Sequence, residues 1–532
     1  MDLIVKSFLL RYPGKSEVTY NAKEPLNSEV TMDYLLTHDV SSTGCKAALV
    51  TTGGQLLETA YEAYPTHFPK PLWSEQDPED WWQAIIKSTK RVLKARKVDV
   101  NQVRGMAYST TMTNIVVLDK DKNLLRPCIF WMDGRAGEEA RFVMRRLGGE
   151  RIFTQIIGAT ASGKDLIPKY IWLKTHEPEV YNQGEYFLDV SGYLLFRTTG
   201  EMVYEWSVAS GLGLFNFKTK KIDSLLMRFF GLDADKFPPL VRSIDKVGEL
   251  TTGAARDLGL RPGIPVFGGA GDPMTAAVGS GTVNEGDAYL NLGTSAFIGV
   301  LTRKQLTGRR GLATIQSADP DMLMLFGETS TAGASLEWAV RELYGAEPGA
   351  EALAAMDRDV EQAEPGAGGL IFTPWMFGER CPIPDESLRG AFINLSINRT
   401  RQQMARAIYE GIAYNLRWII DSIDELYGIK CETLRVIGGG AQGLPWLKII
   451  SDVTGCRLEV LPDPRERLAV GVALVAAVGL EIYPTFQELK PLVPVELVIE
   501  PDDSHQDRYA ELYAAYRRVY PALRDLYHDL NR

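Results

Sequence analysis

The stretch YLLTHDVSSTGCKAALVTTGGQLLETAYEAY, residues 34–64, decides the fold class of this 532-residue chain. Two apolar runs flank the polar turn SSTG, and a third run follows the turn GG. Short apolar runs separated by such turns predict three consecutive strands that form a meander. The pattern returns at 286–302, GDAYLNLGTSAFIGVLT, where the turn GTS separates two apolar runs. We therefore expect each half of the chain to open with a hairpin whose tip carries Gly, Ser and Thr.

Helical patterns separate and follow these strands. Apolar residues recur at three- and four-residue spacing in 77–95, 400–428 and 507–530, which predicts amphipathic helices. The apolar run 468–480 is shorter than the roughly 20 residues that a membrane span needs, and it is typical of a buried helix. Strands that alternate with helices predict an α/β fold.

Length and charge limit the domain number and the partners. A chain of 532 residues is too long for one ordinary core and predicts at least two domains. We expect a boundary near residue 265, in the Gly/Pro stretch before PVFGGAGD. Residues 1–30 then form an N-terminal extension, 31–265 the N-terminal domain and 266–532 the C-terminal domain. The net charge of -10, mixed along the chain, argues against a nucleic-acid or anionic-membrane partner.

The five cysteines are odd in number, far apart and without CxxC spacing. This distribution argues against a disulfide framework and against structural zinc. A reducing, cytoplasmic compartment fits best.

One tract nearly matches a nucleotide-binding loop. Residues 158–165 read GATASGKD, but Asp165 stands where a P-loop has the Ser or Thr that binds Mg²⁺. We also expect Pro168 to prevent a helix from following at once. The tract is therefore not interpreted as a P-loop.

A carboxylate at the end of a strand carries the candidate chemistry. In PVFGGAGDPMTAAVGSG, 265–281, an apolar strand ends in glycines, Asp272 follows, and small residues begin a helix. Such an acid can act as a general base on a hydroxyl. It can equally cap the following helix, and the pattern leaves both roles open.

Asp39 ends the first strand of the 34–64 meander. It could orient Mg²⁺ through water, while Ser42 and Thr43 donate to phosphate and Lys46 adds positive charge. An ordinary turn-forming Asp fits the pattern equally well. Later in the chain, RVIGGGAQGLPW at 435–446 runs from a strand into GGGA, where a flat ring can approach the backbone closely.

The ordered tracts together resemble the FGGY carbohydrate kinase family, and its xylulokinase branch most closely. The resemblance covers nearly the whole chain after residue 30. The tracts that carry it are HDVSSTGCKAAL, WSEQDPEDWW, IFWMDGR, GGAGDPMTAAVGSG, LNLGTSAF, TSTAGASLEW, PWMFGERCPIPDESLRGAF, RAIYEGIAY and VIGGGAQGLPWLKIISDVTG.

The resemblance implies two domains of the actin-like, ribonuclease-H-like type, with a sugar and ATP in the cleft between them. The N-terminal domain would bind the sugar and the C-terminal domain the nucleotide. It also implies ATP and Mg²⁺ as cofactors and is compatible with a homodimer. By resemblance Asp272 is the catalytic base and Asp39 the acidic residue near the metal. The residues matching nucleotide-binding positions are Ser42, Thr43, Lys46, Gly293, Thr294, Gly333, Gly440 and Ala441.

The substrate is expected from the same resemblance, with two departures. Trp131 matches a residue that lines the sugar pocket, but Met112-Thr113 replaces the usual Met-His, and Pro273 replaces the usual Asn after the catalytic Asp. Both changes remove a side-chain donor, which can change the sugar that is accepted. Lys164 and Asp165 are either replacement polar groups or solvated loop charges.

The favoured function is an ATP-dependent sugar kinase for a small ketose, with D-xylulose as the first choice. The alternatives are a kinase for another pentulose or a polyol, such as ribulose, a tetritol or a pentitol, and a non-catalytic nucleotide-binding relative that acts as a sensor. A hydrolase or chaperone-like ATPase of the same superfamily fits least, because such proteins lack the WSEQDP and WMDGR tracts.

Overall fold

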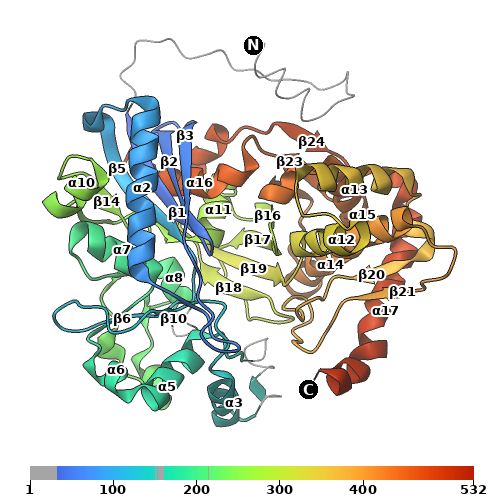
Figure 1. Ribbon diagram of the computed structural model, residues 1–532, viewed down its shortest axis with the longest axis horizontal. Coiled ribbons are helices and arrows are strands. Elements are labelled where there is room, and N and C mark those ends of the chain that lie inside the picture. The colour runs from blue at the N-terminus through green and yellow to red at the C-terminus, as the bar shows by residue number, and fades with distance from the viewer. Residues whose placement is uncertain (1–32, 150–151, 154–160, 212, 214, 532) are drawn as a thin grey trace.

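The computed structural model describes residues 33–149, 152–153, 161–211, 213 and 215–531. The proposed N-terminal extension, 1–30, lies outside the described residues. Two mixed sheets stand side by side, with helices on their outer faces and between them (Figure 1).

The first sheet contains the meander expected at 34–64. Its strands, in spatial order, are β13 (Lys246–Glu249), β14 (Pro265–Phe267), β5 (Val103–Thr110), β1 (Tyr34–Val40), β2 (Gly44–Thr51) and β3 (Leu56–Ala63), with β15 (Ala270–Gly271) also paired to β5. Strands β1, β2 and β3 are antiparallel neighbours, whereas β5 lies parallel to β1 and to β14. The meander is confirmed, with tips at residues 41–43 and 52–55.

The second sheet repeats this topology. Its strands, in spatial order, are β18 (Ala313–Gln316), β19 (Leu323–Thr329), β17 (Ala296–Thr302), β16 (Ala288–Leu292), β22 (Thr433–Ile437), β23 (Arg457–Val460) and β24 (Leu497–Ile499). The order β3-β2-β1-β5-β14 corresponds to β19-β17-β16-β22-β23, with the same parallel and antiparallel neighbours. The α/β class and the repeated hairpin are thus confirmed.

Short two-stranded pairs lie outside these sheets. They are β4 (Glu75–Gln76) with β7 (Cys128–Ile129), β6 (Val116–Leu118) with β8 (Tyr186–Leu188), β9 (Tyr204–Glu205) with β12 (Leu240–Val241), β10 (Phe215–Asn216) with β11 (Lys221–Ile222), and β20 (Ile371–Thr373) with β21 (Ala391–Ile393).

The helices of the first half are α2 (Pro78–Arg96), α3 (Gly137–Arg146), α5 (Leu166–His176), α6 (Pro178–Gln183), α7 (Val190–Thr199), α8 (Trp206–Ser210), α9 (Ser224–Phe229) and α10 (Thr252–Leu258). Those of the second half are α11 (Asp272–Ser280), α12 (Gly333–Tyr344), α13 (Ala350–Gln362), α14 (Arg401–Tyr427), α15 (Leu444–Thr454), α16 (Arg467–Gly479) and α17 (Gln506–Leu530).

Capping residues mark the starts of two of the long predicted helices. The Asp77 side chain accepts a hydrogen bond from the Glu79 amide at the start of α2, and Pro78 occupies the first helical position. Thr400 and Gln403 form a capping box at the start of α14, which ends at the left-handed Gly428. The three helices predicted at 77–95, 400–428 and 507–530 are confirmed as α2, α14 and α17.

Two apolar helices cross between the sheets. Helix α16 packs on β1, β2 and β5 of the first sheet, whereas α11 packs on β16 and β22 of the second (Figure 1). A Cβ atom on Gly279 would lie 1.8 Å from the Arg467 carbonyl oxygen, and one on Gly471 would lie 1.9 Å from that of Thr275. Glycine is therefore required where these helices touch.

Helix α16 confirms the buried helix predicted for 468–480. In the described part of the chain, the helices fall short of the length and apolar character needed to cross a membrane. The expectation that Pro168 prevents a helix after GATASGKD is wrong, because α5 begins at Leu166. Proline is tolerated there because the amides of the first helical turn lack a helical acceptor. Residues 158–160 of that tract lie outside the described residues.

Candidate active site

The two predicted acids lie at the same end of the first sheet. Asp39, near the end of β1, is paired with Lys46 on β2 and with Ser109 on β5. Strand β15 pairs with the same end of β5 on its other side, and Asp272 follows β15 directly. The fold therefore places both carboxylates beside the end of β5.

Burial and nearby negative charge make Asp272 a weaker acid than an ordinary aspartate. Burial raises its pKa to about 8, and the negative charges of Asp39 and Glu328 contribute to the rise. Burial also raises the pKa of Asp39, whereas the nearby Lys46 ammonium and a hydrogen bond from Ser109 lower it. A carboxyl group whose pKa lies near neutral pH is suited to accept a proton from a hydroxyl.

The backbone around Asp272 is held on several sides. The Gly271 amide donates to Ser207 Oγ at 3.0 Å, and Tyr289 donates its hydroxyl hydrogen to the Pro273 carbonyl at 2.6 Å. Thr275 Oγ1 lies 2.8 Å from Ser109 Oγ, which ties α11 to β5. Helix α11 has no side-chain capping hydrogen bond. The capping role considered for Asp272 is therefore not observed.

The first hairpin tip presents two hydroxyls that accept hydrogen bonds. Trp131 Nε1 donates to Ser42 Oγ at 2.9 Å, and the Tyr61 hydroxyl donates to Thr43 Oγ1 at 3.0 Å. Each hydroxyl hydrogen can therefore still be donated to a ligand.

Lys46 reaches across to the second half of the chain. Its ammonium forms an ion pair with Glu466 at 2.8 Å and donates to the Arg465 carbonyl at 3.0 Å. Lys46 is thus engaged by a carboxylate, which an incoming phosphate would have to displace.

The second hairpin tip packs against the start of α12. The Gly293 carbonyl accepts from the Gly333 amide at 3.0 Å, and the Thr294 carbonyl accepts from the Ala332 and Ala334 amides at 2.9 and 3.1 Å. A Cβ atom on Gly333 would lie 2.5 Å from the Gly293 oxygen. The hairpin and the helix start therefore form one compact unit.

The Gly-rich turn after β22 borders the same unit. Gly438 has a φ of 91°, and a Cβ atom on Gly440 would lie 2.8 Å from Leu292 Cβ, next to Gly293. Ala441 is fully buried. Gly293, Thr294, Gly333 and Gly440 are thus brought together at the end of β16.

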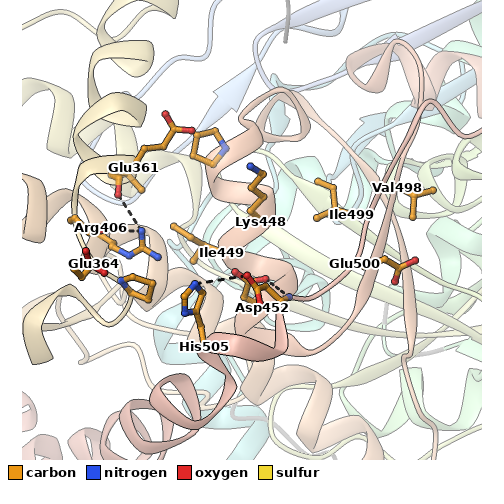
Figure 2. Close-up of a pocket in the computed structure, with 15 residues that line it drawn as sticks. Glu361, Glu364, Arg406, Lys448, Ile449, Asp452, Val498, Ile499, Glu500 and His505 are labelled. Atoms are coloured by element: carbon orange, nitrogen blue, oxygen red, sulfur yellow. Dashed lines mark hydrogen bonds and ion pairs between the residues drawn. The ribbon is translucent and has the colours of Figure 1, made fainter. Parts of the chain in front are cut away.

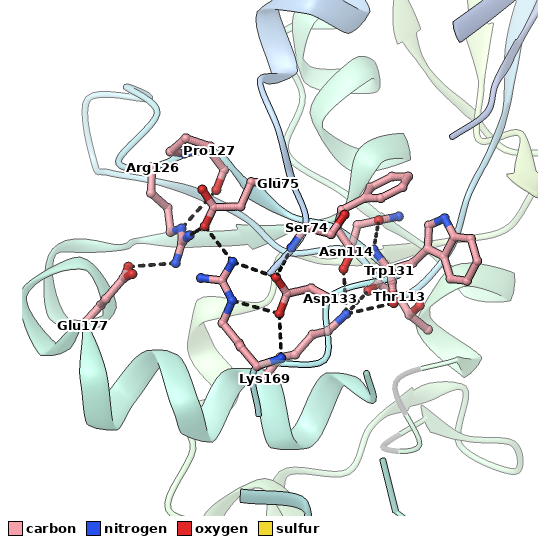
Figure 3. A network of polar contacts seen from close by, with 12 residues as sticks. Ser74, Glu75, Thr113, Asn114, Arg126, Pro127, Trp131, Asp133, Lys169 and Glu177 are labelled. Carbon is pink, nitrogen blue, oxygen red and sulfur yellow. Dashed lines mark hydrogen bonds and ion pairs between the residues drawn. The ribbon is translucent and has the colours of Figure 1, made fainter. Parts of the chain in front are cut away.

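Of the predicted substrate residues, Met112 and Thr113 lie on the loop after β5 and Trp131 lies on the loop after β7. A Cβ atom on Gly271 would lie 2.7 Å from Met112 Sδ, so Met112 lies against the backbone that carries Asp272. Thr113 adopts a left-handed φ of 62°. Trp131 joins the group through its bond to Ser42, and its amide donates to Asn114 Oδ1 at 2.9 Å (Figure 3).

Reasoning from the sequence missed two charged residues from the second half. Glu328 forms an ion pair with Arg380 and accepts from Ser295 Oγ at 3.2 Å. The Arg380 guanidinium lies 5.8 Å from the centre of the Trp131 ring. Arg380 lies in PWMFGERCPIPDESLRGAF, one of the tracts that carry the family resemblance. The sequence could have singled out this residue, but the pairing of Arg380 with Glu328 depends on the tertiary fold.

A polar pocket lies elsewhere in the second half, among α13, α14, α15 and β24 (Figure 2). Its lining includes Glu361, Arg406, Lys448, Asp452 and His505. It contains none of the predicted site residues. The Arg406 guanidinium donates there to Glu410, to the Tyr509 hydroxyl and to two backbone carbonyls.

Comparison with known proteins gives matches over most of the chain. The model of the FGGY family of carbohydrate kinases matches with its N-terminal domain at residues 34–279 and with its C-terminal domain at 288–480. A xylulose kinase from Staphylococcus xylosus is 30% identical over 491 residues, covering 92% of this chain and all of the relative.

Solved structures show the same fold. A ligand-bound xylulose kinase from Lactobacillus acidophilus superposes with a TM-score of 0.86 at 22% identity, covering 94% of this chain and 100% of the other. A gluconate kinase from the same species gives 0.85 at 22% identity, with the same coverage. The expected architecture of two actin-like domains is thereby confirmed.

Proposed function

The chain belongs to the FGGY family of carbohydrate kinases, and from this premise we propose that it transfers the terminal phosphoryl group of ATP to a hydroxyl of a small ketose, D-xylulose in the first instance. The observation that carries the proposal is the placement of Asp272. It lies beside Asp39 and next to the Met112 loop, with a pKa raised to about 8.

Asp272 is proposed as the general base. Its carboxylate takes the proton of the acceptor hydroxyl while the hydroxyl oxygen attacks the γ-phosphorus of ATP in line, and ADP leaves. The bond from phosphorus to the bridging oxygen breaks as the new phosphorus–oxygen bond forms. The electron pair remains on ADP, and the proton remains on Asp272 until solvent removes it.

The two hairpin tips are proposed to hold the phosphates. Ser42 and Thr43 have hydroxyl hydrogens to donate, and Lys46 supplies positive charge from the first sheet. Gly293, Thr294, Gly333, Gly440 and Ala441 are proposed to form the nucleotide side. The close packing of Gly293 against Gly333 supports this assignment, because it holds the hairpin tip, the start of α12 and the Gly440 turn together on one side of the site.

Asp39 is the residue proposed to hold Mg²⁺. Magnesium in phosphoryl-transfer sites is bound through one or two carboxylates together with substrate phosphates, and the Asp39 carboxylate, which lies next to the first hairpin tip, suits that mode. When bound, the ion would neutralise charge on the phosphates.

The acceptor is proposed to lie among Met112, Thr113, Trp131 and Pro273. The similarity to xylulose kinases supports a pentulose, whereas the similarity to a gluconate kinase and the two departures from the expected Met-His and Asp-Asn pairs favour testing other acceptors. Ribulose, tetritols and pentitols remain the alternatives, as does a non-catalytic sensor of ATP.

The test is a coupled ADP-release assay with MgATP and a panel of ketopentoses, polyols, glycerol and gluconate. We expect turnover with D-xylulose and its loss in Asp272→Asn. Turnover with another acceptor only would overturn the D-xylulose assignment and keep the kinase. ATP binding without turnover on any acceptor would overturn the catalytic proposal and favour the sensor.

A further inference from the structure

Lys169 is a buried lysine beneath the proposed acceptor site. It lies on α5 and is fully shielded from solvent. Its ammonium donates to the Phe130 carbonyl at 2.9 Å and to the Thr113 and Trp131 carbonyls at 3.3 Å each (Figure 3). An ammonium has three N–H donors, and here they meet three carbonyls.

These carbonyls belong to two loops that come from different strands. Thr113 follows β5, whereas Phe130 and Trp131 follow β7. Asn114 joins the same loops from the other side, because its Oδ1 accepts from the Trp131 amide at 2.9 Å and its Nδ2 donates to the Met112 carbonyl at 3.1 Å. Lys169 and Asn114 therefore connect the two loops that carry the proposed acceptor residues.

The backbone of Thr113 needs such support. Its φ of 62° is in the left-handed region, which costs a β-branched residue energy unless the surroundings hold it. The bond from Lys169 to the Thr113 carbonyl is one of these restraints. Loss of the bond would free the loop that also carries Met112, which lies against Gly271.

The charged and titratable groups facing Lys169 are Asp133, Asp165, Cys128 and Arg135. Burial lowers the pKa of Lys169 to about 7, and Asp133 opposes this most strongly. Asp133 is itself held by Arg135, through bonds of 2.8 and 2.7 Å, and by the Ser74 amide at 2.6 Å. A neutral amine would keep only two N–H donors for the three carbonyls.

We propose that Lys169 is a positioning residue that sets acceptor affinity by holding the Thr113 and Trp131 loops on one ammonium. The proposal rests on the proposed function in one respect, since it takes these loops as the acceptor site. Lys169 itself does not touch the reacting atoms.

The experiment compares Lys169→Met and Lys169→Arg with Lys174→Met. Lys174 lies on the same helix, but its side chain is 44% exposed and it contacts Gly231 and Asp233 instead. We expect Lys169→Met to raise KM for the acceptor at least tenfold and to change KM for ATP less than twofold. The acceptor KM of Lys169→Arg should lie between those of the wild type and Lys169→Met, because the planar guanidinium cannot donate to three converging carbonyls. Lys174→Met should have the KM values of the wild type.

Two further readouts separate positioning from a general loss of structure. In the wild type, acceptor KM should rise with pH through about 7, and this rise should disappear in Lys169→Met. Hydrogen–deuterium exchange should be faster in peptides covering 111–114 and 128–133 of Lys169→Met, with the rest of the chain unchanged.

Equal changes in both KM values, or unchanged exchange at these peptides, would overturn the proposal. If the wild type phosphorylates no acceptor, the proposed function fails, while the exchange comparison still tests the role of Lys169. If Lys169→Met does not fold, Lys169→Arg decides by the same criteria.

Discussion

Asp272 combines proposed catalysis with a cost in stability. Its pKa of about 8 lies above the ordinary value of 3.8. Between these two pH values the folded protein keeps Asp272 protonated, whereas the unfolded chain has released the proton. The stability from this proton is fully present below pH 3.8 and is lost as pH rises through about 8.

Asp272→Asn should therefore be inactive yet more stable at alkaline pH. We expect kcat to fall by about 10²–10⁴-fold, the usual contribution of a general base. The melting temperature should exceed that of the wild type at pH 8.5 and approach it at pH 5, because an amide has no proton to lose. Calorimetry at both pH values checks this, with the exposed Asp235→Asn as control. A melting difference independent of pH would contradict the assigned cause.

The pH profile of the reaction tests the same carboxyl group directly. Because the base must be ionised, kcat at saturating acceptor should rise with pH and level off above about 8, separately from the acceptor KM. Glu328→Gln removes one of the negative charges that raise this pKa, so the midpoint should move to lower pH. Initial rates between pH 5.5 and 9.5 measure both midpoints. A midpoint that stays in place or moves upward would show that Glu328 does not act on the base.

At the scale of elements, the hairpins were predictable from local patterns. The turns SSTG and GTS separate apolar runs, and polar turns between such runs are strong local signals. The left-handed Gly428 and the Thr400 capping box likewise mark helix ends within a few residues. Pro168 misled the prediction because its place within the first helical turn, where proline is tolerated, depends on where α5 begins.

The site itself was only partly predictable. Resemblance named Asp39, Asp272 and the hairpin residues, and the structure brings Gly293, Gly333 and Gly440 together. Lys169 and Glu328 were missed because their roles come from contacts between distant segments. A buried lysine on a helix looks in sequence like any other helix-forming residue.

The crossing of α11 and α16 gives a prediction at this scale. In Gly471→Ala the new methyl group would lie 1.9 Å from the Thr275 carbonyl oxygen, so the helices must separate. We expect a loss of about 1–3 kcal/mol in the free energy of unfolding, as for other overpacked cores. Chemical denaturation measures it. Gly253→Ala, on α10 with open space at its Cβ position, is the control and should be neutral or slightly stabilising. Equal effects of both would rule out the close contact as the cause.

At the scale of the whole molecule, the proposed phosphate site draws on both halves. Ser42, Thr43 and Lys46 come from the first sheet, and Gly293, Gly333 and Gly440 from the second. A ligand that contacts both halves binds only the folded arrangement. It therefore raises the free energy of unfolding, by about 2.7 kcal/mol at a concentration of 100 Kd.

Lys46→Met should separate this ligand effect from the stability of the free protein. The Lys46–Glu466 ion pair is partly exposed, with each side chain at 22%. Its loss should therefore reduce the free energy of unfolding of the unliganded protein by only about 0–1 kcal/mol and lower its melting temperature slightly. The upward shift produced by a non-hydrolysable ATP analogue with Mg²⁺ should fall by half or more, because a positive charge facing the phosphates is gone. Lys490→Met breaks a comparable pair with Asp287, of 2.7 Å, which involves none of the proposed phosphate residues, and should keep the full shift. Thermal shift titrations of the three proteins decide the matter: a full shift in Lys46→Met would remove Lys46 from the phosphate site, and a loss in both variants would point to a general weakening of the fold.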